Sequence, residues 1–70
     1  MKRLIEITIV YENEKELHVE GLEGTIYYNP EINELGFNNA GNGEVTLNTF
    51  YMKTILIDGD VVKGNVDCYC

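Results

Sequence analysis

The sequence predicts an all-β fold, a small single-domain antiparallel barrel or sandwich of six to seven short strands. In most segments apolar and polar residues alternate with a period of two. β-Branched and aromatic residues, which suit a pleated surface, dominate these segments. Turn-forming sequences recur between them at short intervals. A chain of 70 residues is long enough for one domain only, so we expect residues 1–70 to form a single small β domain.

The first two strands are expected to form a hairpin. The first spans 4–11, and a polar turn at 13–15 leads to the second, which contains Leu17 and Val19. With that turn Tyr11 would pair with Leu17, and the apolar faces of both strands would coincide. The residues that share the apolar face of the first strand are Ile5, Ile7, Ile9 and Tyr11.

The rest of the chain predicts more short strands and no helix. Asn29-Pro30-Glu31 is typical of a turn, and 38–43 is expected to be the loosest loop. Asp58-Gly59 indicates a tight hairpin turn rather than a calcium loop, because the closing Glu of such a loop is missing. The strands are expected over 25–28, 35–37, 45–51, 55–57 and 61–62. The predicted core consists of Ile5, Ile7, Ile9, Leu17, Val19, Leu35, Phe37, Val45, Leu47, Ile55 and Ile57.

Acidic residues are concentrated in one part of the chain. The formal net charge is −7, from 12 Asp and Glu against 5 Lys and Arg. Nine of the acids, but only one base, lie within 6–44. Such a surface repels phosphates, so we expect no direct binding of nucleic acid. The acids would serve either as a solvated face that keeps the protein soluble or as a surface for a basic partner.

The expected contact residues lie in the first hairpin. Residues i and i+2 of a strand lie about 6.8 Å apart on one face, so alternate glutamates can form a spaced row of carboxylates. An outward aromatic residue beside them would anchor a protein contact. The predicted partner-binding residues are Glu12, Glu14, Glu16, Glu20 and Tyr28.

Catalytic and metal sites are not expected. The sequence has no Ser, and its single His, His18, has no second His with which to hold a metal. If the last residues continue a strand, Cys68 and Cys70 would share one face, where they could share a zinc ion with a second chain, be redox-active, or be incidental thiols. We therefore predict no enzymatic activity and no cofactor.

These observations favour an interaction protein. We expect a small acidic protein-binding module, an inhibitor that occupies the basic, nucleic-acid-binding surface of a partner protein. Anti-CRISPR and other phage anti-defence proteins, or inhibitors from other mobile elements, share this composition, and the analogy extends to composition alone.

The alternative is a self-assembling homo-oligomeric β module, either structural or binding a small ligand between subunits. No apolar run is long enough to span a membrane, and Glu6 interrupts the only stretch that imitates a signal peptide. We expect a cytoplasmic protein without membrane contact.

Overall fold

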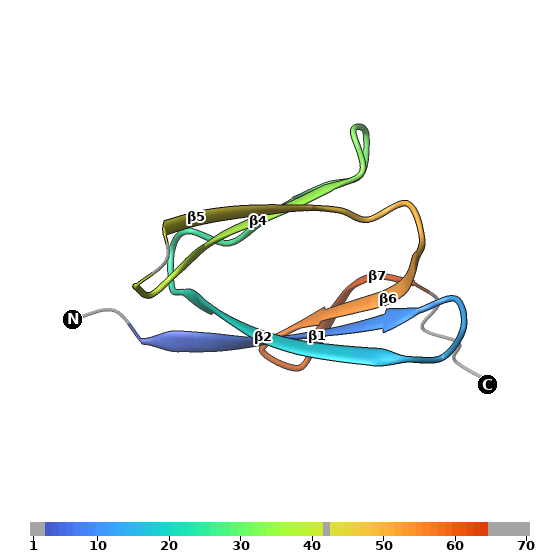
Figure 1. Cartoon of the computed structure of the whole chain (residues 1–70), viewed down its shortest axis with the longest axis horizontal. Coiled ribbons are helices and arrows are strands. Elements are labelled where there is room, and N and C mark those ends of the chain that lie inside the picture. The colour runs from blue at the N-terminus through green and yellow to red at the C-terminus, as the bar shows by residue number, and fades with distance from the viewer. Residues whose placement is uncertain (1–2, 42, 65–70) are drawn as a thin grey trace.

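Two antiparallel sheets face each other as a sandwich in a computed structural model that describes residues 3–41 and 43–64 (Figure 1). One sheet has the strand order β2-β1-β6-β7 and the other β3-β4-β5. The sheets are not closed into a barrel, so the predicted all-β fold is confirmed in its sandwich form. The strands are β1 (Leu4–Tyr11), β2 (Glu16–Leu22), β3 (Tyr27–Asn29), β4 (Glu34–Asn39), β5 (Gly43–Asn48), β6 (Met52–Ile57) and β7 (Asp60–Lys63).

β1 lies in the middle of the larger sheet because one of its faces is almost entirely apolar. Ile5, Ile7 and Ile9 are buried, whereas Glu6 is exposed on the opposite face. Across the ladder, Ile7 pairs with Ile57 and Ile9 with Ile55, so that β6 continues the same apolar face. The alternation read from the sequence therefore places this face toward the second sheet.

The β1–β2 hairpin forms with a register two residues from the predicted one. Ile9, not Tyr11, pairs with Leu17, because the loop closed by the backbone hydrogen bond between Tyr11 and Lys15 spans 12–14 rather than 13–15. The amide of Tyr11 donates to the carbonyl of Lys15 at 2.8 Å, and Glu14 takes the left-handed conformation with φ of 70°. A three-residue loop ending in such a residue is common in hairpins. A shift of two residues keeps each side chain on its predicted face.

The predicted strand over 45–51 is too long. β5 ends at Asn48, whose side-chain Oδ1 accepts a hydrogen bond from the amide of Phe50 at 2.8 Å. This local bond favours a turn over continued extension. The amide of Met52 then donates to the carbonyl of Thr49 at 3.0 Å, and β6 begins at Met52. Phe50 and Tyr51 consequently protrude from the bend.

The predicted hairpin turn at Asp58-Gly59 is confirmed. Both residues have positive φ, 53° for Asp58 and 85° for Gly59, as a type I′ turn requires. The amide of Asp58 also donates to the carbonyl of Glu6 at 2.9 Å. The turn is therefore tied to β1 as well as joining β6 to β7.

The two sheets approach each other most closely where β2 lies against β4. Gly21 is buried there, and a Cβ at this position would lie 2.8 Å from the Cβ of Phe37 and 3.1 Å from Cγ1 of Ile26. Real Cβ atoms do not approach so closely. The missing side chain of Gly21 is thus what allows Phe37 to pack against the backbone of β2.

The core lies between the sheets and agrees largely with the predicted set. Leu17 differs, because 38% of it is exposed at the edge of the larger sheet. Four other predicted members are only half-buried: Val19, Val45, Leu47 and Ile57. Met52, which was not predicted, is buried because β6 starts earlier than expected. The cluster of fully buried apolar residues consists of Ile7, Ile9, Leu35, Phe37, Met52 and Ile55.

Adding a methyl group at Gly21 is expected to separate the sheets. Gly21→Ala should lower the free energy of unfolding by about 1–3 kcal/mol, the usual cost of overpacking a core. Urea denaturation measures this loss. Phe37→Leu in the Gly21→Ala background should recover part of it, and additive effects of the two substitutions would contradict the proposed contact.

The buried hydroxyl of Thr49 is expected to lower the free energy of unfolding. Thr49 is fully buried, and its Oγ1 has no hydrogen-bond partner in the described chain. Thr49→Val keeps the shape and removes this polar group, so it should raise the free energy of unfolding by about 1 kcal/mol. The exposed Thr46→Val serves as the control, with an expected change within about 0.5 kcal/mol. A loss of stability in Thr49→Val would contradict this account.

Candidate functional site

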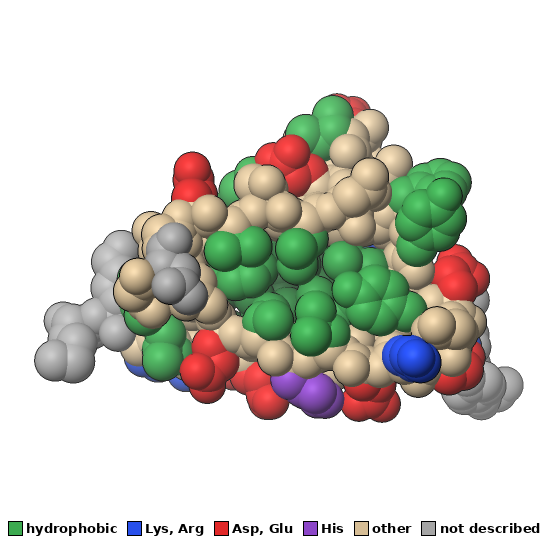
Figure 2. Space-filling model, in the orientation of Figure 1, with side chains coloured by type: hydrophobic (Ala, Val, Ile, Leu, Met, Phe, Trp, Pro, Cys, Tyr) green, Lys and Arg blue, Asp and Glu red, His purple; other side chains and the backbone are tan. Residues whose placement is uncertain are grey.

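A band of hydrophobic side chains is exposed between the two sheets on the side shown in Figure 2, where β5 lies above and β2 below. β2 and β5 are edge strands, so no further strand within residues 3–41 and 43–64 covers this side. We call this apolar band the open side. It consists of the inward-facing residues of the two edge strands, which pair with buried core residues of β1 and β4: Leu17, Val19, Val45 and Leu47.

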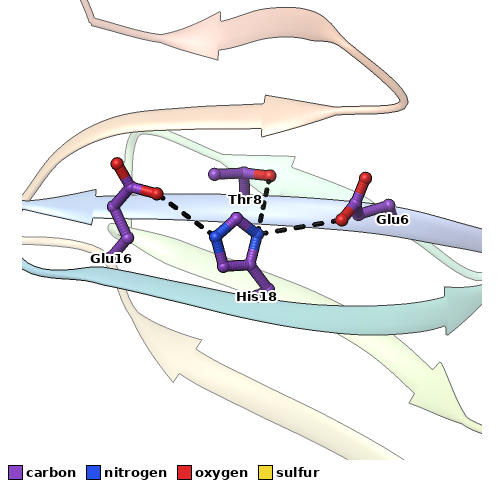
Figure 3. A network of polar contacts seen from close by, with 4 residues as sticks. All are labelled: Glu6, Thr8, Glu16 and His18. Carbon is purple, nitrogen blue, oxygen red and sulfur yellow. Dashed lines mark hydrogen bonds and ion pairs between the residues drawn. The ribbon is translucent and has the colours of Figure 1, made fainter.

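Acidic side chains line the outer face of the β1–β2 hairpin below the open side (Figure 2). His18 lies among them, as Figure 3 shows. Its Nε2 lies 3.2 Å from Oε1 of Glu16, and its Nδ1 lies 3.4 Å from Oγ1 of Thr8 and 3.7 Å from Oε2 of Glu6. We call the surface formed by Glu6, Glu16, His18 and Glu20 the acidic face.

The alternation of β2 explains this arrangement. Glu16, His18 and Glu20 occupy alternate positions, so their side chains project from the outer face while Leu17 and Val19 face the second sheet. All three outer residues are exposed. The acidic face and the open side therefore meet along a single edge strand.

A second group of acids lies at the β1–β2 turn, close to the protruding aromatic residues. The amide of Glu12 donates to the carbonyl of Tyr51 at 3.3 Å, which joins the turn to the β5–β6 bend. A shallow depression of about 250 Å³ lies between Tyr11, Glu12, Asn13 and Tyr51. Phe50 and Tyr51 are 60% and 69% exposed, and their rings meet edge to face with centroids 4.9 Å apart.

Ion pairs engage some of the acids and leave others available. Nζ of Lys53 donates to Oε2 of Glu14 at 2.7 Å, and this hydrogen bond raises the pKa of Lys53 above its ordinary value of 10.5. At the far end of the sheet, Arg3 lies 3.6 Å from Glu23 and 3.3 Å from Asp58. Within 3–41 and 43–64, the carboxylates of Glu12 and Glu20 form neither a hydrogen bond nor an ion pair.

The structure brings the predicted contact residues together only in part. Glu16 and Glu20 share the acidic face, whereas Glu12 and Glu14 lie in the turn that precedes it. Tyr28 is half-buried on β3, pairs with the buried Leu35 and packs against the core. Its role as a contact residue stays a prediction.

The exposed bend formed by Phe50 and Tyr51, which we call the aromatic bend, was not predicted from the sequence. The alternation over 45–51 predicts a strand, in which one ring of the pair would face the core. The preceding Asn48 was the available signal, because Asn side chains often accept a hydrogen bond from the backbone two residues on. In the structure that bond ends the strand and leaves both rings in solvent.

The packing of Tyr27 was also not predicted from the amino-acid sequence. Tyr27 pairs with Gly36 on the outer face of the smaller sheet, where its ring covers the space that a Cβ of residue 36 would fill. Its hydroxyl donates to Oε2 of Glu34. This hydrogen bond raises the pKa of Tyr27 above its ordinary value of 10.0.

In the described part of the chain, no three His, Cys, Asp or Glu side chains are grouped so that they could hold a metal ion. No helix there has the length and apolar character needed to cross a membrane. Cys68 and Cys70, for which the sequence left a shared zinc site open, lie outside the described residues.

Comparisons with protein-family models, curated proteins and solved structures give no match to this chain.

The hydrogen bond between Tyr27 and Glu34 predicts a specific alkaline titration. Absorbance at 295 nm, with Tyr27→Phe subtracted, should show Tyr27 losing its proton above pH 10.0, and in Glu34→Gln at a lower pH than in wild type. Because the folded pKa is raised, this bond contributes stability below the ordinary pKa and loses it as the pH rises through the folded value. An unchanged titration in Glu34→Gln would contradict the assignment.

Proposed function

We propose that the protein is a binding module that attaches to a basic surface of another protein through its β1–β2 hairpin. The observation that carries this proposal is the junction of acidic and apolar surface along one edge strand, with the acidic face on one side of β2 and the open side on the other. Protein interfaces combine an apolar centre with charges that select the partner. An acidic face of this kind competes with phosphates for Lys and Arg, so an inhibitor of a nucleic-acid-binding protein is the role we favour.

Two free carboxylates are best placed to select such a partner. Glu20 lies on the acidic face and Glu12 at the turn. Neither carboxylate forms a hydrogen bond or an ion pair with the described residues, although Glu12 contributes to the raised pKa of Lys53. Glu14, in contrast, already pairs with Lys53, so a partner would have to displace an ion pair to reach it. We therefore assign the main electrostatic contribution to Glu12 and Glu20.

The aromatic bend supplies a second kind of contact. Phe50 and Tyr51 are large, exposed and joined through a backbone hydrogen bond to the acidic turn. Exposed aromatic rings are frequent anchors of protein interfaces, and a ring face also attracts Lys and Arg. Their proximity to Glu12 extends the proposed surface from the acidic face to the end of the sandwich.

The open side also supports self-assembly as a second candidate function. Half-exposed Val19, Val45 and Leu47 together with exposed Leu17 form an apolar surface that a second copy could cover. Size-exclusion chromatography at low and high salt separates the two functions. An apolar homo-oligomer persists in salt, whereas a complex held by acidic and basic charges dissociates.

Charge reversal at the two free carboxylates tests the main proposal. A partner captured from the native cell and eluted stepwise with salt provides the binding assay. Glu12→Lys combined with Glu20→Lys should slow association by about tenfold at low salt and flatten its salt dependence, because long-range attraction acts on the association rate. Stopped-flow or surface-based kinetics measures both effects.

The matched control reverses two acids away from this surface. Glu31→Lys combined with Asp60→Lys changes the net charge by the same amount in the β3–β4 turn and at the start of β7. If association slows equally in both double variants, the effect comes from net charge in general and not from the acidic face. This outcome would overturn the proposal. Both variants should retain near-native stability, since exposed substitutions usually cost less than about 0.5 kcal/mol.

A further inference from the structure

The hydrogen-bond pattern of the β1–β2 ladder identifies which backbone groups of β2 are unpaired. The amide of Tyr11 donates to Lys15, and the amide of Glu23 donates to Arg3, at the two ends of the ladder. Hydrogen-bonded and non-hydrogen-bonded pairs alternate in an antiparallel ladder. The bonded residues of β2 are therefore those at odd positions, from Leu17 to Gly21.

The even positions of β2 consequently direct their N–H and C=O groups away from β1. The last of these positions is Leu22, whose carbonyl accepts a hydrogen bond from the amide of Thr25. The other three are Glu16, His18 and Glu20, whose side chains belong to the acidic face. β2 is an edge of its sheet, and in the described chain no strand lies beside it. The backbone N–H and C=O groups of these three alternate residues are thus available to an added strand.

The two faces of β2 define what an added strand must carry. A strand paired with β2 would place the side chains opposite Glu16, His18 and Glu20 on the acidic face, where Lys or Arg would be favoured. Its alternate side chains would point toward the second sheet, where they would cover Leu17 and Val19 on the open side. The required sequence therefore alternates basic and apolar residues.

We propose that β2 is a docking edge for an extended segment of a partner protein in which Lys or Arg alternates with apolar residues. The segment adds an antiparallel strand to the four-stranded sheet, a common mode of peptide recognition. This inference rests on the proposed basic partner and adds the way in which that partner binds. The backbone supplies affinity, and the alternating side chains supply selectivity.

A second copy of the protein fits this edge less well than a basic segment. Antiparallel pairing of two β2 strands about His18 would place Glu16 of each copy opposite Glu20 of the other, and like charges directly opposite destabilise a sheet. Charged residues on an edge strand are a common protection against such pairing. β3 and β7 are shorter edges, and β5 has one acidic residue, Glu44, so none of the three offers the same charge pattern.

A synthetic heptapeptide with the sequence Lys-Val-Lys-Val-Lys-Val-Lys tests the proposal on the full-length protein. Its binding should slow amide hydrogen exchange of His18 and Glu20, measured by NMR, while Leu17 and Val19 are already protected by β1. A block peptide with four Lys followed by three Val has the same charge and composition. It should bind at least about tenfold more weakly, because it cannot match both faces of β2.

Backbone methylation separates strand addition from charge attraction. In the proposed pairing the Lys residues of the peptide exchange hydrogen bonds with β2, whereas the Val amides point away from it. Methylating the Lys backbone nitrogens should abolish slowed exchange and weaken binding by about tenfold or more. Methylating the Val nitrogens is the matched control and should leave both largely unchanged.

Protein variants test the charges of the docking edge. Glu16→Gln combined with Glu20→Gln should weaken binding of the alternating peptide by about tenfold. Glu31→Gln combined with Asp60→Asn alters the net charge equally and should leave this binding unchanged.

Three outcomes would overturn the docking edge, each with a different consequence. If the alternating, block and methylated peptides bind equally and in a salt-sensitive way, strand addition is wrong, but the proposed binding of a basic partner is retained. Absence of binding by all of them would count against both proposals. Slowed exchange of His18 and Glu20 in the protein alone at high concentration, with dimers on a sizing column, would assign the edge to a second copy.

Discussion

The close approach of β2 to β4 determines how the two sheets of this small protein meet. Gly21 has no side chain, so Phe37 packs directly against the backbone of β2. Only at this point does β2 come fully into the core. Along the strand the inward residues pass from buried Gly21 through half-buried Val19 to exposed Leu17. The same contact that closes the sandwich at one end therefore leaves its apolar interior accessible farther along the edge.

The acidic face and the open side meet at β2 because its side chains point alternately to the two faces of the sheet. With seven short strands in two sheets, the described chain has no element left to cover β2. Its outer residues are charged, which opposes pairing between copies and keeps an exposed edge soluble. In the proposed docking, the same charges would also attract Lys and Arg and so select among the strands that could add to this edge. Protection and recognition would then depend on the same residues.

The sequence predicted the fold well where local patterns and turn chemistry agreed. The isoleucines of β1 and the Asp58-Gly59 turn required only periodicity and φ preferences, and both are confirmed. The β1–β2 register was wrong by two residues because Glu14, a residue that rarely adopts positive φ, does so here. The bend at Phe50 and Tyr51 was missed because their composition favours a strand, and one Asn48 hydrogen bond overrides it.

The candidate site was harder to predict, since it depends on contacts between distant segments. The sequence identified the glutamates of the hairpin, but it could not show that Lys53 neutralises Glu14 while Glu20 stays free. Nor could it reveal that Tyr27 covers Gly36, because this pairing follows from the β3–β4 register. Ion pairs and cross-strand contacts are set by tertiary arrangement, which composition and periodicity do not contain.

Binding of a partner strand at β2 would also stabilise the folded protein. A domain of this size buries a modest fraction of its surface and has little stability in reserve. An added strand would cover Leu17 and Val19 and satisfy the free backbone groups of the edge, contacts that exist only in the folded state. A ligand that binds only the folded state stabilises it by about 2.7 kcal/mol at a concentration of 100 times Kd. The exposed apolar surface that limits the stability of the free protein is therefore the same surface through which a partner would raise it.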